Sequence, residues 1–143
     1  MKNKLIRLVT MSVVMGIPVL FAPPSARGEG NCSTVSFHGS YAYSADGFIT
    51  QTPTQPPFTP IAEAGTYTFD GSGGFSTTNT LSVGGLIIPR TATGTYAVDA
   101  DCTGSATING GVSFKFAIAR AAQSIRFVVS TTGVAVTGKM EKQ

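Results

Sequence analysis

The sequence contains no tryptophan, a single histidine and only two cysteines, and 12% of its 143 residues are charged. One histidine and two cysteines cannot complete a tetrahedral metal site without carboxylates from elsewhere, so we expect no metal and no cofactor. The histidine, His38, is out of phase with Tyr41 and Tyr43 in its expected strand, and no neighbour is implied that would orient it as a general base. We therefore expect it at the surface and assign no catalytic residue.

The first 28 residues have the layout of a secretory signal peptide. Three basic residues precede an uncharged apolar run, 8–21, which would span only ~21 Å as a helix against the ~30 Å of a bilayer core. This length favours cleavage over a retained membrane anchor. We expect cleavage after Gly28, with Ala26 and Gly30 as rival positions, and export to the periplasm or the extracellular space. Residues 29–143 are then enough for one domain.

Removal of the leader changes the charge balance of the chain. Four of the ten basic residues leave with it and none of the seven acidic ones does, so six basic against seven acidic residues give a net charge of −1. The remaining basic residues are scattered and form no run able to neutralise phosphates. We expect no nucleic-acid partner and no membrane partner after cleavage, and the sequence leaves the oligomeric state open.

Cys32 and Cys102 are expected to form a disulfide, because both lie in the exported part of the chain, where thiols oxidise. A reactive thiol is the alternative, but neither cysteine has the basic or histidine-rich surroundings that lower a thiol pKa. A cross-link that closes a loop of about 70 residues would stabilise the fold by ~4 kcal/mol at most on the chain-entropy account.

Alternation of apolar and polar residues predicts eight strands and no helix. The expected ranges are 37–45, 60–69, 74–83, 88–98, 103–109, 112–120, 123–130 and 133–141. Short turns rich in Gly, Asn and Asp join most of them, which favours antiparallel neighbours in a meander. Eight such strands, each with one apolar face, can close into an all-β barrel without exposed edges; a two-sheet sandwich is the alternative.

A short motif, G-[ST]-Y, occurs three times, at 39–41, 65–67 and 94–96. The second and third copies continue to G-T-Y-x-x-D, where the aspartate begins a turn. Each copy places a tyrosine in the apolar phase of its strand, beside a glycine that leaves room. The repeat therefore predicts that Tyr41, Tyr67 and Tyr96 share one lumen.

The segment 51–60 contains four prolines. Proline cannot donate to a strand ladder, so we expect this segment outside the sheet as an extended loop. One interpretation is a plain linker. The other is a lid over one barrel mouth with Phe58 as its apolar contact, because long loops inside a domain often carry function.

Glu63 and Arg90 fall in phase with the apolar faces of their strands, near the start of each. In a meander these two strands run in the same direction with one strand between them, so both side chains would face the lumen at one end, beside Asn79 or Thr77. Such a polar cluster could orient a small ligand. The alternative is that both groups reach water at the rim, since ionisable groups are seldom fully buried. Arg120 is also in phase, but at the opposite end.

The eight-strand pattern, the leader and the aromatic set occur together with two further runs, G-T-Y-x-x-D-x-x-C-x-G at 94–104 and G-K-M-E-K-Q at 138–143. In these features the chain resembles a group of small secreted bacterial proteins of uncharacterised function, over most of its mature length. That group is similar in layout to the allene oxide cyclase and dirigent-type barrels, and more loosely to the calycins. The resemblance implies a barrel but brings no catalytic motif, so it implies cyclase activity for no residue.

These observations allow three readings of function. In the first, a secreted barrel binds a small apolar ligand in its lumen. In the second, an allene-oxide-cyclase-like enzyme uses the same cavity; in the third, a structural or surface-associated module has a core filled by its own side chains. The candidate ligand-binding residues of the lumen are Tyr41, Glu63, Tyr67, Phe69, Asn79, Arg90, Tyr96, Phe114, Phe116 and Phe127.

Overall fold

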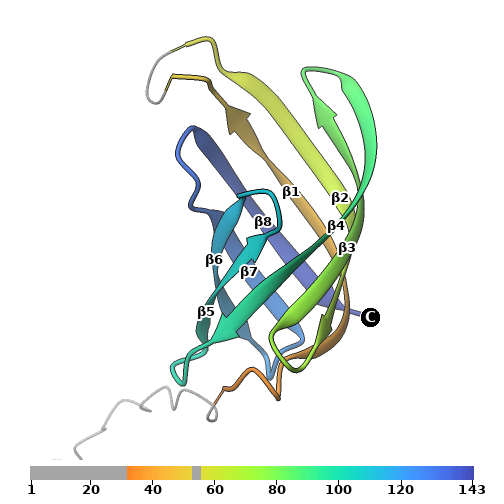
Figure 1. Ribbon diagram of the computed structural model, residues 1–143, viewed down its shortest axis with the longest axis vertical. Coiled ribbons are helices and arrows are strands. Elements are labelled where there is room, and N and C mark those ends of the chain that lie inside the picture. Colours follow the sequence, from red (N-terminus) through yellow and green to blue (C-terminus); the bar gives the residue numbers. More distant parts are fainter. Residues whose placement is uncertain (1–31, 53–55) are drawn as a thin grey trace, which may run out of the picture.

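The computed structural model describes residues 32–52 and 56–143, which form an all-β barrel (Figure 1). The expected leader and its cleavage sites lie outside the described residues. Among the described residues there is no helix long and apolar enough to cross a membrane. The strands are β1 (His38–Ile49), β2 (Thr59–Asp70), β3 (Gly74–Val83), β4 (Leu86–Val98), β5 (Thr103–Ile108), β6 (Ser113–Ala119), β7 (Ser124–Val129) and β8 (Val134–Lys142).

Each strand pairs antiparallel with the next, and β8 returns to pair with β1, so the meander closes on itself. The expected barrel is confirmed, and the two-sheet sandwich is ruled out. Side chains alternate between a buried inner face and an exposed outer face. In β3, for example, Phe75, Thr77 and Asn79 are buried, whereas the intervening serine and threonine side chains are exposed.

Two strand boundaries depart from the sequence expectation. β1 continues to Ile49 rather than ending at 45, because its last residues pair with β2 on one side and β8 on the other. β2 begins one residue before Pro60, so the expectation that all of 51–60 lies outside the sheet is wrong at its end. Pro60 is tolerated because it stands at the start of the strand, where its carbonyl still accepts the Gly84 amide at 2.9 Å. The other boundaries agree within two residues.

The barrel has a long half and a short half. The strands β1–β4 have 10 to 13 residues, and β5–β8 have 6 to 9. We call the end that carries the β1–β2, β3–β4, β5–β6 and β7–β8 connections the open end, and the other the plugged end. Figure 1 shows the β1–β2 and β3–β4 hairpins extending past the short half at the open end.

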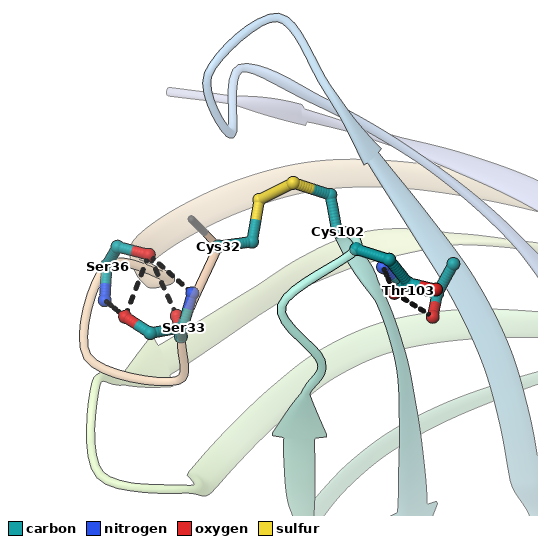
Figure 2. Close-up of a disulfide and its surroundings, with 6 residues drawn as sticks. Cys32, Ser33, Ser36, Cys102 and Thr103 are labelled. Atoms are coloured by element: carbon teal, nitrogen blue, oxygen red, sulfur yellow. Dashed lines mark hydrogen bonds between the residues drawn. A yellow bond between two sulfur atoms is a disulfide. The ribbon is translucent and has the colours of Figure 1, made fainter. Parts of the chain in front are cut away.

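Residues 32–37 cross the plugged end and seal it. Phe37 is 1% exposed, and its ring centroid lies 4.5 Å from that of Phe69. The Tyr96 hydroxyl donates to the Phe37 carbonyl at 2.7 Å. A disulfide between Cys32 and Cys102 ties the start of this segment to the β4–β5 connection, which confirms the expected pairing (Figure 2).

Several rings of the core lie over glycines of the adjacent strand. Phe75 pairs with Gly94, and a β-carbon on that glycine would lie 2.4 Å from the phenyl ring. Phe127 likewise pairs with Gly138, and a β-carbon on that glycine would lie 2.4 Å from the Phe127 ring. The absent side chains thus leave the space that the rings occupy, which lets a narrow barrel hold a largely aromatic core.

Candidate ligand-binding site

The ten side chains expected in the lumen all belong to the inner face of the barrel. Tyr41 lies opposite Tyr67, and the ring centroids of Tyr96 and Phe69 are 5.0 Å apart, so the three motif tyrosines share one interior. Neighbouring ring centroids lie between 4.5 and 6.3 Å apart, the spacing of packed aromatic pairs. In this aromatic part of the interior the side chains pack against one another across the barrel. Space for a ligand therefore has to lie nearer the open end.

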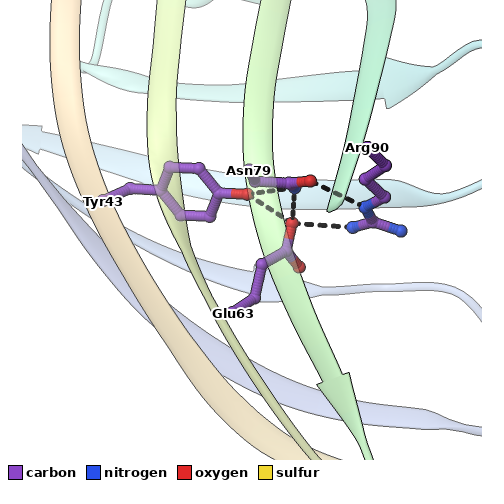
Figure 3. Close-up of polar contacts among 4 residues, drawn as sticks. All are labelled: Tyr43, Glu63, Asn79 and Arg90. Atoms are coloured by element: carbon purple, nitrogen blue, oxygen red, sulfur yellow. Dashed lines mark hydrogen bonds and ion pairs between the residues drawn. The ribbon is translucent and has the colours of Figure 1, made fainter. Parts of the chain in front are cut away.

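A polar cluster, formed by Tyr43, Glu63, Asn79 and Arg90, joins the strands β1–β4 (Figure 3). Arg90 donates from Nη2 to Oε1 of Glu63 at 2.6 Å and from Nε to Oδ1 of Asn79 at 3.0 Å. The Tyr43 hydroxyl and the Asn79 amide also donate to Oε1 of Glu63. Three donors therefore converge on one carboxylate oxygen. The structure brings together the three residues that the sequence placed here, while their binding of a ligand stays a prediction.

Burial and charge set the protonation of this cluster. Burial lowers the pKa of Arg90, but the hydrogen bond and the negative charge of Glu63 outweigh that effect and raise it overall. Burial, strengthened by the hydrogen bond to Glu63, raises the pKa of Tyr43, and burial together with the Glu63 charge raises that of Tyr67. Arg90 thus stays charged and both tyrosines stay neutral donors at physiological pH.

Thr77 places a further hydroxyl in the interior, one inward position from Asn79. The residue is 3% exposed, and its Oγ1 has no hydrogen bond of normal geometry within the described part of the chain. Tyr67, directly opposite in β2, interacts with this side chain, and the interaction lowers the Tyr67 pKa. A buried hydroxyl without a good partner is costly, so this oxygen is available to a polar atom that enters the barrel.

Beyond the polar cluster, toward the open end, the inner face becomes mainly aliphatic. Thr59, Ile61 and Glu63 occupy successive inward positions of β2, about 7 Å apart. Ile61 pairs with Val83 of β3. A cleft of about 460 Å³ lies between Ile49, Thr59 and Val83 on one side and residues 50–52 with Pro57 on the other. This volume is in the usual range for a small-molecule site.

Arg90 is the most exposed member of the polar cluster. Its side chain is 36% exposed, whereas that of Glu63 is 12% exposed. Within the ranges that the structure describes, Nη2 and Nε are occupied by Glu63 and Asn79, and Nη1 makes no hydrogen bond. The Nε and Nη2 donors of the guanidinium are therefore fixed by the protein, and Nη1 is free to donate.

Three residues that the sequence singled out lie outside this arrangement. His38 is exposed at the plugged end, where its Nδ1 contacts the Val35 carbonyl at 3.1 Å. Arg120 is exposed in the β6–β7 connection, also at the plugged end. Phe58 is half exposed, and because 53–55 lie outside the described residues, the lid stays a prediction.

Sequence reasoning left several buried residues out of the site, and four of them contact or lie opposite its members. Tyr43 and Phe75 have the same phase as their aromatic neighbours, so alternation contained the signal that would have found them. Thr77 was named only as a possible neighbour of the charged pair. The role of Phe37 carried no such signal, because it depends on how the preceding chain crosses the barrel end.

Comparison with known proteins found no relative of this chain. No protein-family model, curated protein or solved structure matches the chain. Within 32–52 and 56–143, no group of three or more His, Cys, Asp and Glu side chains is placed to hold a metal ion.

Proposed function

We propose that this protein binds a small amphipathic molecule at the open end of its barrel. The apolar part of the ligand lies in the cleft beside Ile49 and Val83. The ligand extends past Ile61, and its carboxylate or another acceptor group receives hydrogen bonds from Arg90. The observation that carries the proposal is the Arg90–Glu63 ion pair, held at 2.6 Å on the inner face, two inward positions of β2 from Thr59 of the cleft.

Two features of Arg90 support this role. Its guanidinium is already oriented by Glu63 and Asn79, so a ligand does not have to immobilise a free side chain. The planar group also matches carboxylate geometry and gains strength where water is partly excluded. The Thr77 hydroxyl, deeper in the barrel, offers a second polar contact to a ligand long enough to reach it.

Binding is favoured here over the cyclase-type alternative. A general base must be free to take a proton from its substrate. Glu63 is the carboxylate of the polar cluster, and its Oε1 already accepts three hydrogen bonds. This arrangement suits Glu63 to positioning Arg90 rather than to proton transfer.

The test uses an anilinonaphthalene sulfonate dye, an amphipathic anion with an aromatic body. Because the chain has no tryptophan, dye fluorescence is read without an indole background. We expect saturable binding of one dye, weakened about tenfold by Arg90→Met, which corresponds to ~1.4 kcal/mol. The matched control is Arg126→Met, since Arg126 is exposed on the outer wall of β7 and should leave dye binding unchanged.

Arg90→Met removes one donor from Glu63, so its melting temperature is recorded beside the titration. A double variant, Glu63→Gln with Arg90→Met, removes the charge of both partners and should bind the dye as weakly as the single variant. Equal binding by the Arg90 and Arg126 variants would show that Arg90 does not anchor the ligand. If the wild-type protein binds no dye, and native mass spectrometry of protein from its own host finds no ligand, the filled-core reading replaces the proposal.

A further inference from the structure

Charge is distributed unequally between the two ends of the barrel. The four connections of the open end fall within stretches of sequence that contain no charged residue: 47–62, 71–89, 103–114 and 127–138. Besides His38, the plugged end carries the ionisable side chains in and beside its turns and at the end of the last strand. These are Asp70, Asp99, Asp101, Arg120, Glu141 and Lys142.

The open end also carries most of the exposed large hydrophobic side chains. Of the seven such residues in the described part of the chain, five lie on the two projecting hairpins, namely Phe48, Phe58, Leu86, Ile87 and Ile88. Leu86 and Ile87, at the tip of the β3–β4 hairpin, are 65% and 61% exposed. An apolar surface of this kind on an otherwise hydroxyl-rich protein marks an interaction site.

The β3–β4 tip is apolar on both of its faces. Successive side chains of a strand point to opposite sides, so Leu86 and Ile88 point to one face and Ile87 to the other. A second protein molecule that docks on a hairpin covers one face and leaves the other in water. A fluid lipid layer surrounds the tip and covers both.

We propose that the open end docks on a lipid surface, with the β3–β4 tip and Phe58 entering the layer between headgroups and acyl chains. No charged group has to be desolvated, because the hairpins that enter carry none. This surface lies beyond the proposed ligand site and does not depend on it. The proposal departs from the expectation of no membrane partner, which was drawn from charge alone. The attraction here is apolar, and it arises where the fold gathers uncharged loops at one end.

The test is co-sedimentation with vesicles of phosphatidylcholine. We expect the wild-type protein to partition onto the vesicles, and Ile87→Asp to lower the partition coefficient at least tenfold. Val35→Asp is the matched control, because Val35 is 75% exposed but lies at the plugged end, and it should change partitioning less than twofold. Sodium chloride between 0.05 and about 1 M should not release the protein, since the contact is uncharged.

Three results would overturn the lipid assignment. They are the absence of wild-type binding to phosphatidylcholine vesicles, an equal loss with the Ile87 and Val35 variants, and release by salt. A dimer in sedimentation velocity that Ile87→Asp dissociates, without vesicle binding, would assign the surface to a second copy instead. Ile87 faces away from the cleft, so dye binding by Ile87→Asp stays at the wild-type level whether or not docking occurs, and the two proposals fail separately.

Discussion

Single glycines set the room available to the aromatic core. Each glycine of the three G-[ST]-Y copies lies directly opposite an inward aromatic residue of the adjacent strand. These pairs are Gly39 with Phe69, Gly65 with Tyr43, and Gly94 with Phe75. Of these three glycines, Gly94 leaves space for the ring opposite it, because a β-carbon there would meet the Phe75 ring. A β-carbon on Gly65 would instead meet Asn79, and one on Gly39 would meet Lys142.

Gly94→Ala tests this role of the motif glycine. The added β-carbon would lie 2.4 Å from the Phe75 ring and 2.3 Å from the Thr107 carbonyl oxygen, so either the ring or the strand has to move. We expect the free energy of unfolding, measured in urea, to fall by about 1–3 kcal/mol. Thr95→Ala, one residue along and exposed, should cost less than about 1 kcal/mol. Equal losses in the two variants would show that packing against Phe75 is not the cause.

At the scale of elements, the segment 32–37 acts as a plug that its disulfide holds in place. The segment is bound on one side by the Cys32–Cys102 bridge and on the other by the bond from Tyr96 to the Phe37 carbonyl. Val98 adds a third tie, since its amide donates to Oγ1 of Thr34 at 3.3 Å. The bridge joins residues separated by 70 positions, so its loss frees a long stretch of the unfolded chain.

Replacing both cysteines by serine should lower the stability of the barrel by up to ~4 kcal/mol. The measurement is urea denaturation followed by circular dichroism, and reduction of the wild-type protein under the same conditions should reproduce the loss. Because the bridge lies at the plugged end, dye binding at the open end should survive in the folded variant. Unchanged stability in both experiments would mean that the other contacts of 32–37 suffice to hold the plug.

At the scale of the whole molecule, all four tyrosines of the chain belong to one interior. Burial is the largest cause in each case, and it raises the pKa of Tyr41 from 10.0 to about 12 and also raises those of Tyr43, Tyr67 and Tyr96. The folded state therefore favours the neutral hydroxyl. This contribution to stability is fully present below pH 10 and is lost as the pH rises through the raised values.

We expect the barrel to unfold cooperatively on the alkaline side of pH 10. Absorbance at about 295 nm should report tyrosinate, and its rise should coincide with the loss of the strand signal in circular dichroism, because buried tyrosines ionise only when the barrel opens. Independent ionisation of one or more tyrosines near pH 10, with the strand signal intact, would show that those hydroxyls reach solvent in the folded protein.

Much of the fold could be predicted from the chain. The alternation of residues such as Phe75, Thr77 and Asn79 identified the inner face, because the side-chain period of a strand is two and is independent of its partners. The phase of Glu63 and Arg90 placed both on that face, and the antiparallel order placed them at one end. The pairing of the disulfide followed from there being only two cysteines.

The features that could not be predicted depend on which residues of different strands meet. Convergence of Tyr43, Asn79 and Arg90 on one oxygen of Glu63 requires the register of four strands, which no single strand contains. The plug requires the chain before β1 to fold back across the barrel, and the uncharged open end emerges only when alternate turns are gathered at one side. The sequence by itself determined the strands and the face that each buries, since those are local properties; the tertiary structure decided the polar cluster, the filled interior and the apolar end, since those depend on closure of the sheet.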